Sequence, residues 1–547
     1  MTEDRADAVA PSNRDQALLS DPVFVSAVSR IRLRSEKQAD IESLERTYVE
    51  TGLLPQLDNV NNQVVYGRRG TGKSHILQVL GLRRNRTYGD LAVYIDMRLL
   101  GSAQAFVEPN RPLSVQCIGL YKDLLLLVWE HLQAAATDPH RNADVDVMAR
   151  ISDLGDAITH VAQVTASRQV SAERTTTATA GSNVGGEIGW RAASVTAGLS
   201  VEEHSANKLA IAYDEVFRDT VVFADVQKLL DAAINALQVP QLILLIDEWT
   251  ALSPEVQPFM AEFIKRTLLP SPHITVKIAS LEYRSKLSVP TERNNRIGFE
   301  VGGDISAVLD LDDYYVYERN PDQVVECFEE LLYRHVRNEL PDGYLELAKV
   351  DSSVSLRQAL FSEHATFVEL VRASEGVVRD FINIFNAAFF DAQRRGRDRV
   401  DVKGVREAAR KWYETDKAVN LSEDQHLVLS RIITEVIGRK HARSFMLERS
   451  HGSHPMIQSL FDYRVIHLIQ KGYSDRDNPG VRYNVYTLDY GTYVDLIQTK
   501  SQPSLNLFED ESETDQSVPF DDRRSIRRII VDPALLEPHP YPTSEKF

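Results

Sequence analysis

Cysteine and long apolar runs are scarce in this chain. Its two cysteines, Cys117 and Cys327, are too few for a disulfide framework or a zinc site, and we interpret them as core residues in a reducing compartment. No run of about 18 apolar residues occurs, which argues against a membrane span. The first residues are polar and lack the apolar core of a signal peptide. We therefore expect a cytoplasmic protein with no membrane segment.

The chain also lacks an excess of positive charge. Lys and Arg number 62 against 79 Asp and Glu, which gives a net charge of −17. This balance excludes indiscriminate nucleic-acid binding by the whole surface, but it leaves room for one locally basic module. The composition is that of a globular protein, and 547 residues are too many for one core. We expect about two to four domains.

A phosphate-binding motif stands near the N-terminus. The stretch Gly67-Arg-Arg-Gly-Thr-Gly-Lys-Ser74 matches G-x-x-x-x-G-K-[ST], with a β-branched run before it and a helical run after it. Glycines at this spacing let backbone N–H groups approach phosphates, and the helix N-terminus adds a favourable dipole. Lys73 would bridge the β- and γ-phosphates, and the hydroxyl of Ser74 would hold Mg²⁺. The alternative, a Gly-rich turn with a surface lysine, is less compatible with the flanking strand and helix. The predicted nucleotide-binding residues are Gly67, Arg68, Arg69, Gly70, Thr71, Gly72, Lys73, Ser74 and His75.

Two acids end an aliphatic strand roughly 170 residues later. Five aliphatic residues precede Asp247 and Glu248, as in a strand buried on both faces. Asp247 would organise the shell of Mg²⁺, and Glu248 would polarise the attacking water. Alone, such a strand is equally typical of an ordinary core. Together with the phosphate loop, it favours ATP hydrolysis over passive binding.

Further strands are expected at 63–66, 91–97, 274–280 and 305–309, with helices at 114–136 and 254–269. Ser280 would end its strand at the carboxyl edge, where a polar side chain could reach the γ-phosphate or the water. Arg296, in a polar stretch, could serve a neighbouring subunit as an arginine finger. Arg284 and Arg293 are weaker candidates, and each of the three is also compatible with a solvated surface.

The segment 138–209 differs in composition from its surroundings. A helix is expected over 145–170, and from Thr175 the chain is rich in Ala, Thr, Ser and Gly, as in two strands around a Gly turn. We interpret it as an inserted hairpin or arm. Surface decoration and contact with a partner, DNA or another subunit remain open alternatives.

The C-terminal half begins all-helical, over 320–413, and includes Gly376 with Arg379 three residues later in the first turn of a helix. Residues 421–500 then follow the order helix, helix, helix and two strands, which fits a winged helix, with 465–469 as either the end of the third helix or a strand. In that order the second strand covers 492–497. Residues 525–531 are a candidate for a short docking element within an otherwise acidic tail.

The order of these parts resembles the AAA+ ATPases, and within them the origin-recognition and replication-initiator branch, of a bacterial type. The likeness covers roughly residues 23–500 without the insertion. It implies a P-loop parallel sheet, a helical lead-in near the adenine, a helical lid whose Arg379 is the second sensor of the γ-phosphate, and a winged helix. Arg68, Arg69, Ser280 and Trp249 depart from the usual residues, so related bacterial signalling and phage-defence NTPases stay open.

The winged-helix region is less acidic than the rest. Residues 421–500 carry ten Lys and Arg against nine Asp and Glu, a net charge of +1, so the remainder carries −18. Basic residues cluster before its second helix and on its wing, where phosphate contacts are expected. A protein-binding role is the alternative, and a metal site at His451 and His454 lacks further ligands. The predicted DNA contacts are Arg439, Lys440, Arg443, Arg449, Arg476 and Arg482.

These features predict an α/β AAA+ switch that binds ATP and Mg²⁺, hydrolyses ATP, and acts on double-stranded DNA as a homo-oligomer or with a partner protein. The alternative is a nucleotide-gated signalling or phage-defence scaffold whose winged helix binds protein. The expected parts are a disordered 1–22, an ATPase domain at 23–318, a lid at 319–418, a winged helix at 419–500 and a tail at 501–547.

Overall fold

A computed structural model describes most of the chain. The described residues are 17–34, 41–101, 113–138, 145–158, 223–291, 295–317, 319–440, 442–474, 480–494 and 529–537. They fall into two compact units, each considered by itself. The sheet unit contains Gly52–Tyr66 and Lys73–Leu309, and the helical unit contains Met1–Thr51, Gly67–Gly72 and Asp310–Phe547. The phosphate loop therefore groups with the helical unit, although the strand before it and the helix after it belong to the sheet unit.

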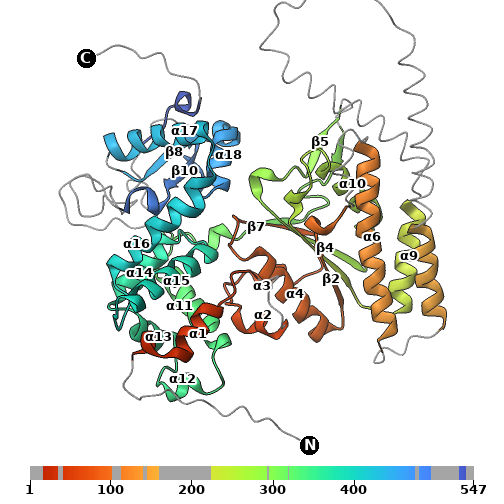
Figure 1. The fold of residues 1–547 in the computed structure, drawn as a ribbon. Coiled ribbons are helices and arrows are strands. Elements are labelled where there is room, and N and C mark those ends of the chain that lie inside the picture. The colour runs from red at the N-terminus through yellow and green to blue at the C-terminus, as the bar shows by residue number, and fades with distance from the viewer. Residues whose placement is uncertain are drawn as a thin grey trace, which may run out of the picture. The chain divides into compact units, whose positions relative to one another are not determined.

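A five-stranded sheet organises the sheet unit (Figure 1). Its order is β2-β3-β4-β1-β7, and the pairs β1–β4, β3–β4 and β2–β3 are parallel. The central strands β3 and β4 are buried along their whole length, as expected for parallel strands covered on both faces. The strands are β1 Gln63–Tyr66, β2 Leu91–Asp96, β3 Leu242–Asp247, β4 Ile274–Ser280 and β7 Ala307–Asp310. All five expected strands are present.

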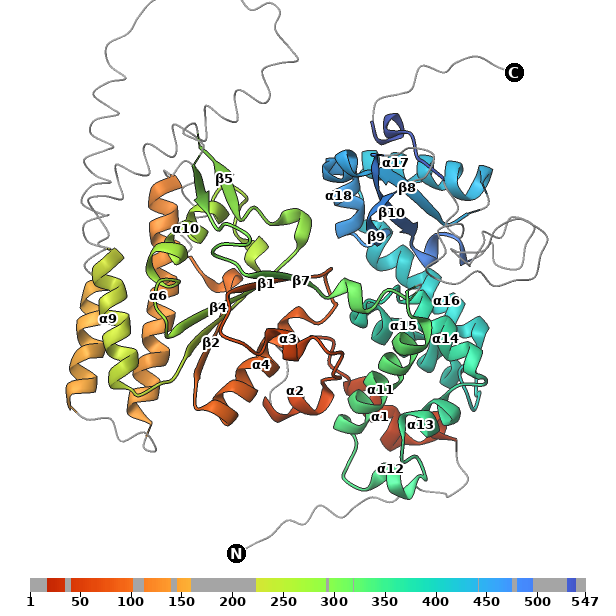
Figure 2. The ribbon, with the colours of Figure 1, turned by 180° about the vertical axis from the view of Figure 1, so that it is seen from behind.

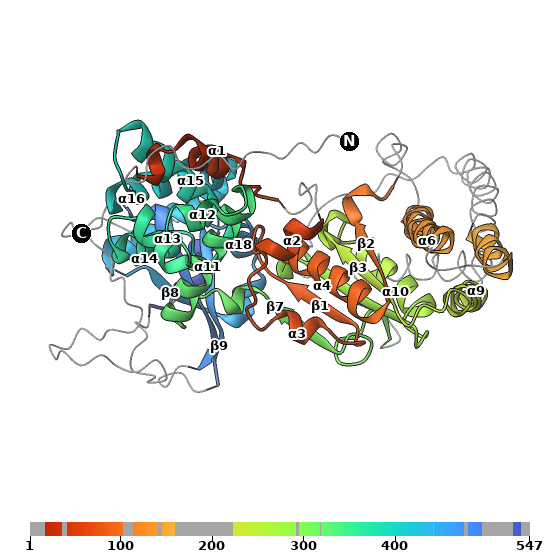
Figure 3. The ribbon, with the colours of Figure 1, turned by 90° about the horizontal axis from the view of Figure 1, so that it is seen from below.

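Helices cover both faces of this sheet (Figure 3). On one face lies α4 (Lys73–Tyr88), with the short α3 (Leu54–Leu57) beside it. On the other lie α6 (Leu113–Thr137), α9 (Phe223–Ala236) and α10 (Gln257–Thr267). A further helix spans 145–158, and the rest of the predicted insertion, including its hairpin, lies outside the described residues. The polar stretch around Arg296 forms a small hairpin of β5 (Ser288–Pro290) and β6 (Arg296–Gly298), which was not predicted.

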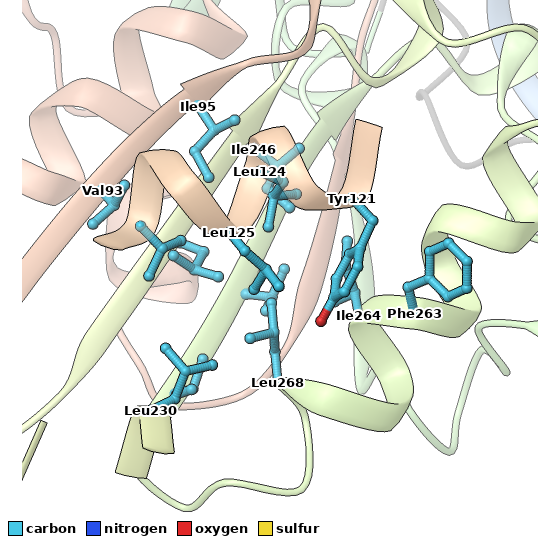
Figure 4. Packing of buried hydrophobic residues seen from close by; sticks show 14 of the residues in the cluster. Val93, Ile95, Tyr121, Leu124, Leu125, Leu230, Ile246, Phe263, Ile264 and Leu268 are labelled. Carbon is cyan, nitrogen blue, oxygen red and sulfur yellow. The ribbon is translucent and has the colours of Figure 1, made fainter. Parts of the chain in front are cut away.

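The core of the sheet unit lies between α6, α10 and the sheet (Figure 4). Leu124 and Leu125 of α6, Ile246 of β3 and Leu268, the residue after α10, belong to one buried cluster. Burial of these large aliphatic groups is the main stabilising contribution for such a layer. Because Ile246 precedes Asp247, the packing of α6 fixes the end of the strand that carries the two acids.

Helices form most of the helical unit, and α14, α15 and α16 lie side by side (Figure 2). The lead-in helices pack on α11, where Arg334 donates to the carbonyl of Tyr48 at 2.5 Å and Arg46 donates to Asn338 at 2.9 Å. The helices are α1 Pro22–Arg30, α2 Ile41–Thr47, α11 Pro321–Glu339, α12 Tyr344–Leu347, α13 Ser353–Leu360, α14 His364–Ala373, α15 Val378–Arg394 and α16 Val402–Trp412.

The C-terminal module combines helices with a three-stranded antiparallel sheet, an arrangement compatible with the predicted winged helix, and we keep that name for it below. Its antiparallel sheet has the order β8-β10-β9. Its elements are α17 Glu423–Ile433, β8 Ser444–Glu448, α18 Pro455–Asp462, β9 Ile466–Ser474 and β10 Arg482–Leu488. Strand β8 was not predicted. The strand expected at 492–497 is wrong where the chain is described, because Tyr490–Thr492 is a 3₁₀ helix capped by Asp489.

A C-terminal segment covers the edge of this sheet. Met446 of β8 donates to the carbonyl of Ile529 at 2.7 Å, and Val531 donates back to Met446 at 3.0 Å. A 3₁₀ turn over Pro533–Leu536 follows, and Arg431 of α17 donates to the carbonyl of Glu537 at 2.6 Å. Part of the candidate docking element therefore docks, and its residues 525–528 lie outside the described chain. Among the described residues, no helix is both long and apolar enough to cross a membrane.

Candidate nucleotide site

The phosphate loop has the backbone that close approach to an anion requires. Gly70 and Gly72 take φ values of 89° and 100°, which favour glycine. A Cβ added to Gly72 would meet nothing within 4 Å, so the backbone there faces open space. Helix α4 begins at the next residue, Lys73, and the dipole at a helix N-terminus favours a phosphate at this point. The loop residues fit a bound nucleotide phosphate.

Arg379 lies against this loop. Its backbone N–H donates to the carbonyl of Gly70 at 3.1 Å, and a Cβ on Gly70 would stand 2.7 Å from the Cβ of Arg379. The turn before it depends on Gly376, whose φ is 76° and whose added Cβ would stand 2.3 Å from the carbonyl oxygen of Tyr315. Arg379 is the second residue of α15, in the first turn as predicted. The G-x-x-R pattern thus brings its arginine to the phosphate loop.

Arg68 is turned away from the loop's open side. Its side chain is 5% exposed, and its Nε lies 3.1 Å from Asp312 Oδ1. Its backbone N–H donates to Asp312 Oδ2 at 2.9 Å, and its Nη2 donates to the carbonyl of Glu375 at 2.9 Å. The side chain of Arg68 is thus engaged with protein groups in this structure, and its predicted nucleotide contact stays a prediction. Arg69 is exposed, and the hydroxyl of Thr71 is buried and donates to the Arg68 carbonyl at 2.9 Å.

The acids at the end of β3 are held in defined positions. Asp247 is 1% exposed, and its two carboxylate oxygens accept from Tyr94 at 2.6 Å and from the N–H of Glu248 at 2.8 Å. Glu248 takes a left-handed backbone, φ 51° and ψ 42°, while its side chain is 38% exposed. A glutamate in that region is strained, and such strain is typical of functional sites. The carboxylate of Asp247 and the hydroxyl of Ser74 are hard oxygen donors of the kind that Mg²⁺ prefers.

Two residues at this edge were missed by the sequence reasoning. Tyr94 lies in β2, and Arg98 lies just after it. Strand β2 pairs with β3 so that Asp96 stands opposite Asp247. Arg98 donates from Nε to Asp96 at 2.9 Å and reaches Glu248 Oε1 at 3.9 Å. Burial opposes ionisation of Asp96, but the hydrogen bonds from Arg98 outweigh it and lower the pKa of Asp96 below its usual value. The alternation of side-chain types over 91–97 was the available sequence signal for a polar group at the carboxyl edge of the sheet.

Ser280 and the arginine candidates occupy different settings. Ser280 ends β4 at the carboxyl edge as expected, opposite Tyr66, the residue before the phosphate loop. Its hydroxyl is buried and hydrogen-bonds to that of Ser285, so contact with a nucleotide would require it to change partners. Arg284 and Arg296 are exposed. Arg293 lies outside the described residues.

The predicted DNA contacts are divided. Arg443 is 3% exposed, and its Nη1 donates to the hydroxyl of Tyr493 at 3.3 Å and lies 3.7 Å from Glu375 Oε1. The cation of Arg443 is thus enclosed within the helical unit in this structure, and its predicted DNA contact stays a prediction. Arg476 lies outside the described residues, and α18 contains no Lys or Arg. The exposed members of the set are Arg439, Lys440, Arg449 and Arg482.

His467 of β9 joins the winged helix to the phosphate loop. Its Nδ1 accepts from Arg68 Nη1, and its Nε2 lies 2.8 Å from Asp489 Oδ2. This pair of contacts fits a neutral ring with its proton on Nε2, since a second proton would face the guanidinium. Burial and the charge of Arg68 lower the pKa of His467 to about 3, against the opposing effect of Asp489. Sequence patterns gave no signal for this contact between residues about 400 apart.

Comparisons with known proteins give no sequence relative. No known protein family and no curated protein matches the chain. Among solved structures, Cdc6p from Pyrobaculum aerophilum is similar at 12% identity and a TM-score of 0.32, over 85% of this chain and 93% of that one. Aeropyrum pernix ORC2 has 12% identity and a TM-score of 0.35, over 86% and 94%. Aeropyrum pernix ORC1 in complex with DNA has 13% identity and a TM-score of 0.30, over 82% and 93%.

Replacement of Gly376 by alanine should damage the loop contact. We expect Gly376→Ala to destabilise the protein by more than the about 1–2 kcal/mol of left-handed strain, because the Cβ also meets the Tyr315 carbonyl. Urea unfolding followed by circular dichroism measures the loss. Gly343→Ala is the control, since Gly343 has φ 77° but no atom within 4 Å of an added Cβ. Equal losses in the two variants would contradict this account.

Acid should destabilise the protein through His467. The unfolded histidine takes a proton near pH 6.5, whereas the folded one stays neutral down to about pH 3. The unfolded state then binds more protons between these values, so stability falls as the pH decreases from 6.5 towards 3. At pH 5 the loss should be about 2 kcal/mol. Urea midpoints at pH 7 and pH 5 test this, and His467→Asn should show a smaller loss. An equal loss in both proteins would refute the assignment.

Proposed function

We propose that this protein is an ATPase of the AAA+ type that uses ATP binding and hydrolysis as a switch. The observation that carries the proposal is the strained backbone of Glu248 next to Asp247. The carboxylate of Asp247 is held by the hydroxyl of Tyr94. A strained, partly exposed carboxylate next to an anchored buried one suits a residue that orients water beside a metal ligand. A passive nucleotide site has no need of this second acid.

Each residue of the site then has a chemical role. The phosphate loop with Lys73 binds the phosphates, and Arg379, held against Gly70, contacts the γ-phosphate. Glu248 accepts a proton from the attacking water as the bond to the γ-phosphate breaks. Mg²⁺, held by Ser74 and Asp247, would neutralise charge that develops on the phosphate oxygens.

We further propose that the switch acts on double-stranded DNA through the winged helix, with assembly as a homo-oligomer or with a partner protein. Support comes from the exposed cations Arg439, Lys440, Arg449 and Arg482, which could contact phosphates around α18 and the wing. Arg296, exposed in the β5–β6 hairpin, is the proposed arginine finger for a neighbouring subunit.

A second candidate is a nucleotide-gated signalling or phage-defence scaffold whose winged helix binds protein. Two observations favour it. Helix α18, which would enter a DNA groove, carries Asp462 and no cation. The edge of β8 already holds a peptide, the segment at 529–531, by backbone hydrogen bonds. Strand addition to a sheet edge is a common mode of peptide recognition.

ATP turnover, with and without duplex DNA, tests the switch. Glu248→Gln should lower kcat by about 10²-fold or more while ATP binding persists, since only the proton acceptor is lost. Lys73→Ala should abolish binding. Glu255→Gln is the matched control, because Glu255 is exposed and lies outside the proposed site. Normal turnover in Glu248→Gln would refute its role. Turnover that DNA does not stimulate would favour the protein-binding candidate.

Salt-dependent DNA binding by the full chain tests the exposed cations. Arg439→Ala combined with Lys440→Ala should weaken binding for all duplex sequences and reduce the slope of log K against log salt by about 2, because two phosphate contacts are lost. Fluorescence anisotropy with labelled duplex measures this. Arg410→Ala on α16 is the control, as an exposed arginine paired with Glu414. An unchanged slope in the double variant would exclude these residues from a DNA surface.

A further inference from the structure

A chain of buried charges runs through the helical unit from the phosphate loop to α15. It starts at Arg68 and His467, and His467 contacts Asp489. Lys417, in the turn after α16, donates to Asp489 Oδ2 at 2.5 Å and lies 3.1 Å from Asp380 Oδ2. Each of these five side chains is buried. This series of side-chain contacts is therefore continuous from the phosphate loop through the winged helix to the lid.

Both ends of the chain reach the proposed nucleotide site. Arg68 lies within the phosphate loop, and its carbonyl accepts from the hydroxyl of Thr71, so its position bears on the next turn of the loop. Asp380 directly follows Arg379 in the first turn of α15. Arg464, between α18 and β9, also ion-pairs with Asp380. The winged helix thus contacts the loop through His467 and contacts α15 directly through Arg464, while Asp489 reaches α15 only through Lys417.

We infer that His467 of the winged helix is a positioning residue for the nucleotide site, acting through Arg68. The inference rests on the proposed ATP site. His467 accepts a hydrogen bond from the guanidinium of Arg68, and Asp312 accepts one from the backbone N–H of the same residue, so the two acceptors together hold this loop residue in place. Loss of the acceptor would leave Arg68 a buried cation with one partner fewer, and the loop would reorganise around it. The position of the winged helix and nucleotide affinity are then coupled, and by linkage the coupling is reciprocal.

The nature of the contacts separates this role from simple packing. Buried ion pairs add little to stability over apolar side chains of equal volume, because their desolvation offsets their attraction. Packing alone would therefore be met by an apolar core at this position. The series of contacts instead links charged groups from the phosphate loop to the first turn of α15, the two elements of the proposed nucleotide site. The neutral ring of His467 also accepts from Arg68 at Nδ1 and donates to Asp489 from Nε2. These two roles fix which partner each ring nitrogen can have.

Two variants at position 467 divide the two contacts of the histidine. In His467→Asn the amide oxygen can take the place of Nδ1 and still accept from Arg68, while the contact with Asp489 is lost. In His467→Gln the amide nitrogen can take the place of Nε2 and still donate to Asp489, while the acceptor for Arg68 is lost. Each variant keeps one hydrogen bond, so their stabilities should be similar. The readout is the Kd of the full chain for a fluorescent ATP analogue, by anisotropy.

We expect His467→Gln to weaken nucleotide binding about tenfold and His467→Asn to change it less than about threefold. Tyr490→Phe is the control, because Tyr490 anchors the same segment to α14 through Glu369 at 2.6 Å and has no place in the chain of charges. Arg68→Gln combined with His467→Gln should bind no more weakly than Arg68→Gln alone.

The outcomes separate this inference from the proposed function. If the wild type binds the analogue and His467→Gln and His467→Asn bind it equally, the inference is overturned and the ATP site stands. Additive losses in the double variant overturn it as well. If Tyr490→Phe weakens binding as much as His467→Gln, the effect is one of general stability and the inference fails. No binding by the wild type would overturn the proposed function together with the inference.

Discussion

The burial of Arg68 constrains the helical unit more than any other single interaction. A guanidinium that leaves water must find acceptors at several of its donors, and an uncompensated buried charge is strongly destabilising. Its partners come from three places far apart in the chain. They are Asp312 just after β7, the carbonyl of Glu375 before α15, and His467 of the winged helix. One loop residue therefore requires the lid and the winged helix to meet around the phosphate loop.

The same requirement explains the unusual turn before α15. Glu375 is itself in a left-handed conformation, with φ 48°, and Gly376 follows with φ 76°. This turn presents the carbonyl of Glu375 to Arg68 and brings the N–H of Arg379 to the carbonyl of Gly70. The hydrogen bond that the Glu375 carbonyl accepts from Arg68 thus offsets part of the free-energy cost of the strained turn. Glu248 is likewise left-handed, and its backbone N–H donates to the carboxylate of Asp247, so its strained backbone is tied to the acid beside it.

The strands and the two motifs were predictable because their signals are local. Short segments rich in β-branched and aliphatic residues, at 63–66, 242–247 and 274–280, indicate buried strands without reference to the rest of the chain. The neighbour relations were not predictable in the same way. Tyr94 meets Asp247 only through the register of β2 and β3. Arg443 reads as a surface cation in sequence, yet Glu375 and Tyr493 enclose it. Strand β8 is masked by its charged flanks, and its edge is covered by residues far along the chain.

The winged helix consequently has an inner and an outer role that draw on different residues. Its inner face, with His467, Arg464 and Arg443, is committed to buried partners in the lid and the phosphate loop. Its outer face has cations beside α18 and on the wing, but none on α18 itself. In the proposed ATPase, a partner on the outer face would act on the phosphate loop through these enclosed inner contacts, because Arg68 lies among them and its several acceptors leave it little tolerance for movement.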